Sequence, residues 1–173
     1  MSKSWFYLLL LFWQSSLDAQ KLQKYPIGNS GCQAYNFCDP GEFELNRSED
    51  SSAVWTAACT VDSVTYGIIC VKLYDETSDL SAAEALLISY LDFLKLSFDV
   101  TRAAGYGKGH RLQGLENTRG VIDYWEDKDK NQIKIKGWAD TRFIAVLYAY
   151  SRKDAIDSKT DIFLNGFRFP EMK

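Results

Sequence analysis

The segment at residues 141–150, "TRFIAVLYAY", decides how this chain folds. Its apolar residues follow one another instead of alternating with polar ones, so a strand formed here is apolar on both sides. Strands with this composition are buried on both faces and lie in the interior of a sheet. We therefore expect a central strand at 141–150, with the neighbouring elements arranged around it.

Two segments before this strand alternate as half-buried strands do. They are 119–127, "RGVIDYWED", and 131–138, "NQIKIKGW", where Ile133 and Ile135 alternate with two lysines. A period of two indicates a strand with one buried face. The charged stretch "EDKDKN" at 126–131 favours a hairpin turn between them. Together these segments predict an antiparallel meander that ends in the central strand.

A second pair of strand signals lies at 53–61, "AVWTAACTV", and 64–73, "VTYGIICVKL". Aliphatic and aromatic residues alternate with smaller or polar ones in both. A tight turn at residues 62–63 joins them into a hairpin. In the resulting register, Cys59 lies opposite Tyr66.

The clearest helix signal is at 78–100, "SDLSAAEALLISYLDFLKLSFDV". Ser81 and Glu84 have the spacing of a capping box, which predicts the start of the helix. So broad an apolar arc predicts packing against a sheet, and a groove for a cofactor is the alternative. The arc contains a stripe at helical spacing and three residues that widen it: Leu87, Leu91, Leu94 and Phe98, with Leu86, Tyr90 and Phe93.

The two ends of the domain have weaker signals. A short helix begins near Asp157 or Ser158 and runs to about Asn165, where Gly166 ends it. Residues 20–40 lack apolar periodicity and contain two prolines and two glycines, which predicts an irregular lead segment. We expect one domain over residues 41–173.

The order of these elements predicts an α+β fold, in which an antiparallel β-sheet is covered by a long amphipathic helix and a short C-terminal helix. The chain resembles the PsbP-like sandwich family over about residues 37–169. The likeness is clearest in "RFIAVLYAY" at 142–150 and "KTDIFLNGFRF" at 159–169, which match the final strand, helix and ending of that family. That family includes an accessory subunit of the oxygen-evolving complex and a Ran-binding nuclear import factor. The resemblance implies a binding or assembly role without catalysis.

The first residues, "MSKSWFYLLLLFWQSSLDAQ", are typical of a secretory signal peptide. Lys3 precedes an apolar run that is shorter than the ~20 residues needed to cross a bilayer. We expect residues 1–19 to be removed by cleavage after Ala19, with Gln20 as the first mature residue. The protein is then secreted or periplasmic and keeps no stable membrane span, whereas an N-terminal membrane anchor is the alternative.

Four cysteines follow the predicted signal peptide: Cys32, Cys38, Cys59 and Cys70. An even number in an exported chain favours disulfides over free thiols or a zinc site. The predicted hairpin places Cys59 and Cys70 about four residues apart along the strands, too far to bridge at about 3.4 Å per residue. A longer loop would change this register, so a Cys59–Cys70 bond is disfavoured and stays an alternative. We therefore favour a Cys38–Cys59 bond, with Cys32 and Cys70 as the second candidate pair.

The segment at 105–114, "GYGKGHRLQG", contains the only histidine. Its glycine spacing matches neither a dinucleotide fingerprint nor a P-loop, so we expect an exposed connector between helix and strands. The alternative is a ligand-binding loop, in which Tyr106, Lys108, His110 and Arg111 hold an anion together with glycine amides.

Composition excludes several classes of function. A net charge of −3 provides no basic surface for nucleic acid. One histidine rules out a multi-histidine metal site, and there is no G-x-S-x-G elbow, so we expect no metal, cofactor or catalytic residue. The sequence predicts an exported, non-enzymatic binding or accessory module that contacts another envelope or secreted protein. The alternatives are a carrier of an apolar or anionic small molecule and a hydrolase using a carboxylate pair.

Overall fold

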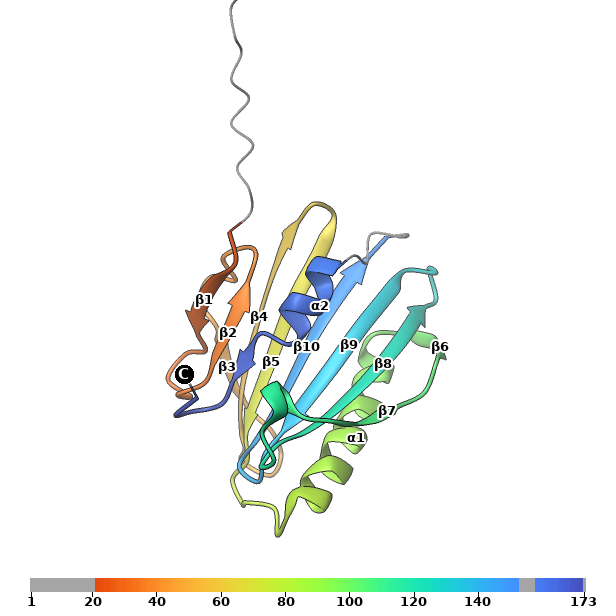
Figure 1. The fold of residues 1–173 in the computed structure, drawn as a ribbon. Helices are drawn as coiled ribbons and strands as arrows, with labels where there is room; N and C mark the ends of the chain where they lie inside the picture. The colour runs from red at the N-terminus through yellow and green to blue at the C-terminus, as the bar shows by residue number, and fades with distance from the viewer. Residues whose placement is uncertain (1–20, 153–157, 173) are drawn as a thin grey trace, which may run out of the picture.

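The computed structural model describes residues 21–152 and 158–172. Within these ranges the chain forms two antiparallel sheets and two α-helices (Figure 1). The predicted signal peptide lies outside the described residues. The larger sheet has the strand order β3-β4-β5-β10-β9-β8-β6, with β7 also pairing with β8, and the smaller sheet has the order β1-β2-β11.

The element bounds in chain order are β1 (Gln23–Pro26), β2 (Gln33–Asn36), β3 (Glu44–Arg47), β4 (Ala53–Val61), β5 (Val64–Lys72), α1 (Leu80–Ser97), β6 (Val100–Ala103), β7 (Gly107–His110), a 3₁₀ turn η1 (Leu112–Gly114), β8 (Arg119–Asp127), β9 (Gln132–Ala139), β10 (Phe143–Ser151), α2 (Ser158–Leu164) and β11 (Phe167–Arg168).

The centre of the larger sheet matches the prediction. Strand β10 pairs with β5 on one edge and with β9 on the other. Its side chains alternate between two buried clusters, with Phe143, Ala145 and Leu147 in one and Ile144 and Val146 in the other, which explains its apolar composition. Strands β8, β9 and β10 form the predicted meander. The predicted β4–β5 register is confirmed, because Cys59 lies opposite Tyr66 and Trp55 opposite Cys70. Asp62 turns the hairpin with a φ of 49°.

Helix α1 lies over one end of the sheet, above β6, β8 and β9. The helix begins two residues earlier than the predicted capping box implies, because the N-cap is Asp79 and not Ser81. The Asp79 carboxylate accepts from the backbone N–H of Ser81 and of Ala82, both at 2.8 Å. Leu87 approaches the sheet closely at Gly137, where an added Cβ would lie 2.5 Å from the leucine side chain. The buried stripe of α1 is Ala83, Leu87, Leu91 and Leu94.

The opposite face of the larger sheet carries α2 and the smaller sheet, as Figure 1 shows. The predicted fold class, one antiparallel sheet covered by a long and a short helix, is therefore wrong. Among the described residues, 45% lie in strands and 18% in helices, so this part of the chain is mostly β and forms two sheets. We refer below to the α1 face and the α2 face of the larger sheet.

The physical reason for this correction lies in the lead segment. Residues predicted to be irregular form β1 and β2, and β2 also pairs with β11 near the C-terminus. Pro26 ends β1, and Gly28 and Gly31 turn the chain with φ of 49° and 84°, so the residues that interrupt the pattern are hairpin residues. Ile27 and Ala34 then fill the core of the α2 face.

Candidate functional site

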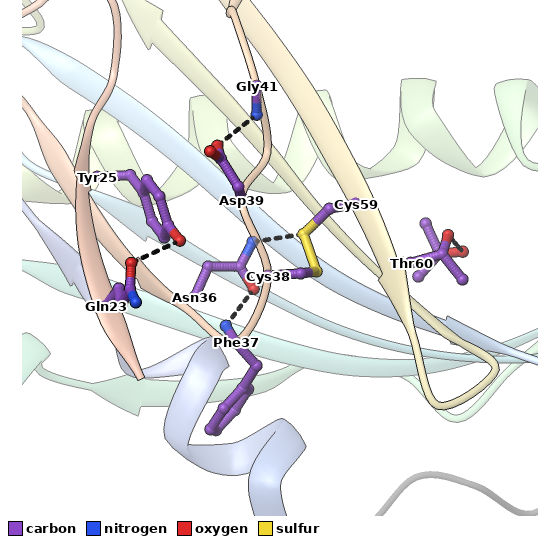
Figure 2. Close-up of a disulfide and its surroundings, with 10 residues drawn as sticks. Gln23, Tyr25, Asn36, Phe37, Cys38, Asp39, Gly41, Cys59 and Thr60 are labelled. Carbon is purple, nitrogen blue, oxygen red and sulfur yellow. Dashed lines mark hydrogen bonds between the residues drawn. A yellow bond between two sulfur atoms is a disulfide. The ribbon is translucent and has the colours of Figure 1, made fainter. Parts of the chain in front are cut away.

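A disulfide joins Cys38, which follows β2, to Cys59 on β4 (Figure 2). This is the predicted pair, and its Cα atoms are 6.0 Å apart. The buried Asn36 side chain is satisfied beside it, since Nδ2 donates to Cys59 Sγ at 3.2 Å and Oδ1 accepts from the Phe37 N–H at 2.8 Å. The bond fastens the smaller sheet to the α2 face.

Cys32 and Cys70, the second candidate pair, are free thiols in this structure. Both are buried in the core of the α2 face, with exposed fractions of 1% and 0%. A hydrogen bond with Cys32, together with burial, raises the pKa of the Cys70 thiol well above its usual value. Cys70 is therefore held as an unreactive thiol.

The loop at 105–114 divides its polar side chains between two places. Tyr106 packs toward α1, where its hydroxyl donates to Asp92 and accepts from Lys95 Nζ at 2.8 Å. Lys108 is exposed. His110 ends β7, and Arg111 lines a pocket on the α2 face. The structure thus brings His110 and Arg111 to one region and places Tyr106 in another.

Asp123 is fully buried beside Tyr106 and accounts for the position of this loop. Its carboxylate accepts from the Gly105 N–H at 3.0 Å and from Trp125 Nε1 at 2.7 Å, and it lies 3.5 Å from Lys95 Nζ. Burial lowers the pKa of Lys95, but its hydrogen bonds with Tyr106 and Asp92 raise the pKa by more, so the net shift is upward. Because Asp123 has no exposed surface, it does not form an open cleft with Asp92 of the kind a carboxylate-pair hydrolase uses.

A hollow of about 540 Å³ lies on the α1 face, between the helix and the strands that the helix does not cover. We call it the apolar groove and define it by six side chains, three from the sheet and three from α1: Val54, Val71 and Ile144, with Leu86, Tyr90 and Phe93. The loop after β3 forms its rim. The groove exists because α1 packs mainly against β6, β8 and β9, while Val71 of β5 is already buried in the core beneath the helix and the β3–β4 edge of the sheet carries no helix.

The helix side of the groove is an exposed apolar stripe. Leu86, Tyr90 and Phe93 recur at helical spacing, and Leu86 and Phe93 are 40% and 59% exposed. The rings of Tyr90 and Phe93 stack, with centroids 6.2 Å apart. The sequence prediction assigned these residues to the core. The width of the apolar arc was the available signal, because one helix in contact with one sheet buries a narrower stripe than α1 carries.

Charge is distributed unevenly along the chain. Residues 41–99, which include β3, its following loop and α1, hold eleven acidic and three basic side chains, a net charge of −8. Residues 100–173 hold ten acidic and fourteen basic side chains, a net charge of +4. At the rim of the groove, Glu49 and Asp50 accompany one cation, Arg47. The groove therefore lies in the acidic part of the molecule.

The rim is ordered by its own hydrogen bonds. The Asp50 carboxylate accepts from the Ser52 N–H at 3.0 Å and from the hydroxyls of Ser48 and Ser52. The bond from the Ser48 hydroxyl is the main cause of the lowered pKa of Asp50. Arg47 donates to the Ser51 carbonyl at 3.0 Å. Glu49 takes no part in this arrangement of the turn, so its charge is available at the rim.

No protein-family model matches the chain, and no curated protein matches its sequence. The resemblance to the PsbP-like family therefore stays a prediction. In the described part of the chain, no helix combines the length and apolar character required to span a membrane.

Proposed function

We propose that this protein is an exported binding module that docks an apolar, basic helix of a partner protein in the groove beside α1. The observation that carries the proposal is the apolar stripe of α1 beside this hollow, in which Leu86 and Phe93 are exposed and Tyr90 is half-buried. An exposed apolar hollow of this kind, rimmed by polar residues, is characteristic of an interaction site. The proposed partner is another secreted or envelope protein.

A helix fits the groove better than an isolated small molecule. The α1 face has one helix over β6, β8 and β9, and a second helix beside it would cover β3–β5 and complete the layer. Leu86, Tyr90 and Phe93 have the spacing at which one helix presents a ridge to another. Taking a fully exposed side chain of this size to full burial contributes roughly 1.5–3 kcal/mol. These three residues are already partly buried, so each contributes a fraction of that on docking.

The charge of the partner follows from the rim. With a net charge of −8 over residues 41–99, an acidic partner is repelled and a basic one is attracted. Rim charges act mainly on the association rate and on the choice of partner. We therefore expect lysines or arginines on the flank of the docked helix, facing Glu49 and neighbouring carboxylates.

Export is supported by the chemistry of the cysteines. The Cys38–Cys59 disulfide is the kind of bond that persists in oxidising compartments and is rare in the cytosol. Secretion or release into a periplasm remains part of the proposal, together with the predicted signal peptide.

The proposal is tested with a labelled synthetic helix of about 15 residues, whose leucines recur at i, i+3, i+4 and i+7 and whose remaining positions hold lysine. Its binding is followed by fluorescence anisotropy. We expect the Phe93→Ser variant to bind about tenfold more weakly or worse, because it loses a buried aromatic contact. Leu96→Ser is the matched control, since Leu96 is an exposed residue of α1 outside the groove.

A second arm tests the charge. The same peptide with glutamate in place of lysine should not bind, and Glu49→Lys should weaken binding of the lysine peptide, as should added salt. Equal binding of both peptides, equal effects of Phe93→Ser and Leu96→Ser, or no binding at about 100 μM peptide would each overturn the proposal.

A further inference from the structure

The α2 face carries a cluster of basic side chains that the proposed function does not use. It lies where β7, η1, β9 and β11 meet α2, in the part of the chain with a net charge of +4. Its members are His110, Arg111, Lys134, Lys136 and Arg168. Lys134 is paired, because its Nζ lies 2.6 Å from the Asp161 carboxylate.

A pocket of about 630 Å³ opens beside this cluster, within the size range of small-molecule sites. Arg111 and Arg168 supply its cationic wall, and Leu22, Tyr35 and Ile162 supply its apolar wall. Asp161 also lines the pocket, and its bond to Lys134 offsets its charge. A ligand here therefore meets cations on one side and apolar surface on the other.

Arg168 is fixed in place by neutral acceptors. Its NH1 donates to the carbonyls of Asn165 and Phe167, at 3.1 and 2.6 Å. The Gln113 side-chain amide is oriented with its oxygen toward Arg168, where it accepts from Arg168 Nε at 3.2 Å and from Arg168 NH2. The guanidinium carbon lies 5.0 Å from the centre of the Tyr35 ring. Of the five N–H groups of an arginine, one remains for a ligand, and none of these acceptors cancels the charge.

Lys136 adds a second uncompensated cation below the pocket wall. It is 8% exposed, and its Nζ donates to Asn165 Oδ1 at 3.0 Å and lies 4.6 Å from the centre of the Trp138 ring. Within residues 21–152 and 158–172, neither Lys136 nor Arg168 has a carboxylate within 4 Å.

Burial is the main cause of the lowered pKa values of Lys136 and His110, and a neighbouring cation contributes to each. Burial lowers the pKa of Lys136 and the Lys134 charge adds to this, although Asp161 opposes it. Burial lowers the pKa of His110, with the Lys136 charge as a further cause. An anion bound nearby would relieve this repulsion.

We propose that this pocket binds a small organic anion, a carboxylate or phosphate group attached to a flat apolar body. The anionic group lies against Arg111 and the remaining N–H of Arg168, and the apolar body lies against Tyr35, Leu22 and Ile162. A ligand anion can replace the present partner of Arg111, which is Glu116 at 3.1 Å. The Glu116 side chain is 88% exposed, so breaking this ion pair costs little free energy. This site is on the other face of the sheet from the apolar groove and does not depend on it.

Isothermal titration calorimetry with phenyl phosphate and benzoate tests the proposal, with benzyl alcohol as the neutral comparison. Either anion should bind, and Arg111→Gln should weaken its binding about tenfold because a charge-assisted hydrogen bond is lost. Lys108→Gln is the matched control, since Lys108 is an exposed cation of the same segment that does not line the pocket. Arg111 is exposed, so both variants should keep the melting temperature of the wild type.

Any one of three results would overturn the proposal: benzyl alcohol binding as tightly as the anions, equal effects of Arg111→Gln and Lys108→Gln on anion binding, or no binding of either anion at millimolar concentration. Phe93→Ser, which alters only the groove, should leave anion binding unchanged. Loss of peptide docking with intact anion binding, or the reverse, therefore separates the two proposals.

Discussion

The two faces of the larger sheet both carry apolar side chains, but these are buried on the α2 face and partly exposed on the α1 face. On the α2 face, the smaller sheet and α2 cover the strands, and Phe163 and Phe167 are fully buried. On the α1 face, one helix covers part of the strands, and Phe93 keeps 59% of its surface exposed. The α2 face is closed by a disulfide and carries basic side chains, whereas the α1 face is open and borders the acidic part of the chain.

We infer from this difference that the α2 face contributes more to the stability of the fold and that the α1 face is the one available for binding. Burial of apolar surface stabilises the fold, so the closed face is where large substitutions cost most. An exposed apolar stripe contributes little to the fold and is available to a partner. The predictions below compare the two faces directly.

The largest expected effect comes from a matched pair of phenylalanines, both on helices. Phe163→Ala on the α2 face should lower the free energy of unfolding by about 3–5 kcal/mol, because it leaves a cavity in the closed core. Phe93→Ala on the α1 face should change it by no more than about 0.5 kcal/mol. Urea unfolding of both variants measures the difference. A cost above about 2 kcal/mol for Phe93→Ala would show that the groove is closed in solution.

The disulfide is the next largest contribution to the closed face. Replacing Cys38 and Cys59 together by serine should lower the free energy of unfolding by about 3 kcal/mol, since the bond closes a loop with a sequence separation of 21. Docking of the basic peptide on the open face should be unchanged at temperatures where the variant is folded.

Thiol counting gives the control for this prediction. Wild-type protein denatured without reductant should show two reactive thiols, from Cys32 and Cys70, and the folded protein should react slowly because both are buried. Four reactive thiols would contradict the Cys38–Cys59 bond, and none would mean that Cys32 and Cys70 are also joined.

The smallest effect concerns a residue whose burial costs stability. Lys136→Met should raise the free energy of unfolding by about 1 kcal/mol at neutral pH, because a buried cation without a carboxylate partner is replaced by an apolar side chain of similar length. Thermal unfolding measures this change. A destabilised variant would instead show that the contacts of Lys136 with Asn165 and Trp138 hold the fold together.

The pH dependence sharpens the same comparison. Burial lowers the pKa of folded Lys136 below its ordinary value of 10.5. Between the lowered pKa and 10.5 the unfolded chain binds more protons than the folded chain, so the wild type gains stability as pH rises through this window. The advantage of Lys136→Met should therefore shrink as pH is raised toward 10.5, and an advantage that stays constant would contradict the assignment.

Much of the larger sheet was predictable from local patterns. The runs at 119–127, 131–138 and 141–150 became β8, β9 and β10, and the hairpin register between 53–61 and 64–73 was confirmed. That register disfavoured a bond between Cys59 and Cys70, and the preferred Cys38–Cys59 pair was confirmed. Strand alternation and turn residues are properties of adjacent positions, so one sequence is enough to read them.

The candidate sites were less accessible to the same reasoning. The apolar arc of α1 was visible, but its division into a buried stripe and an exposed one depends on where the helix lies on the sheet. Judged by the sequence alone, the loop at 105–114 is one unit. In the structure its Tyr106 hydrogen-bonds to Asp92 of α1, whereas His110 and Arg111 lie near the α2 face. The register of β7 against β8 shifts between Gly107 and His110, and Gly109 has a φ of 84°, so simple alternation along the segment does not predict which face each side chain takes.

The sequence by itself determined the strands of the meander, the β4–β5 hairpin and the two helices, because each rests on short-range periodicity. For the cysteines it supplied only a preference for Cys38–Cys59, because four cysteines allow three connectivities. Only the tertiary structure decided that residues of the lead segment form a second sheet with Phe167 and Arg168, that Phe93 is exposed while Phe163 is buried, and that Lys136 and Arg168 both contact Asn165. These outcomes depend on contacts between segments far apart in the chain, and the residues on one side of such a contact do not specify their partner.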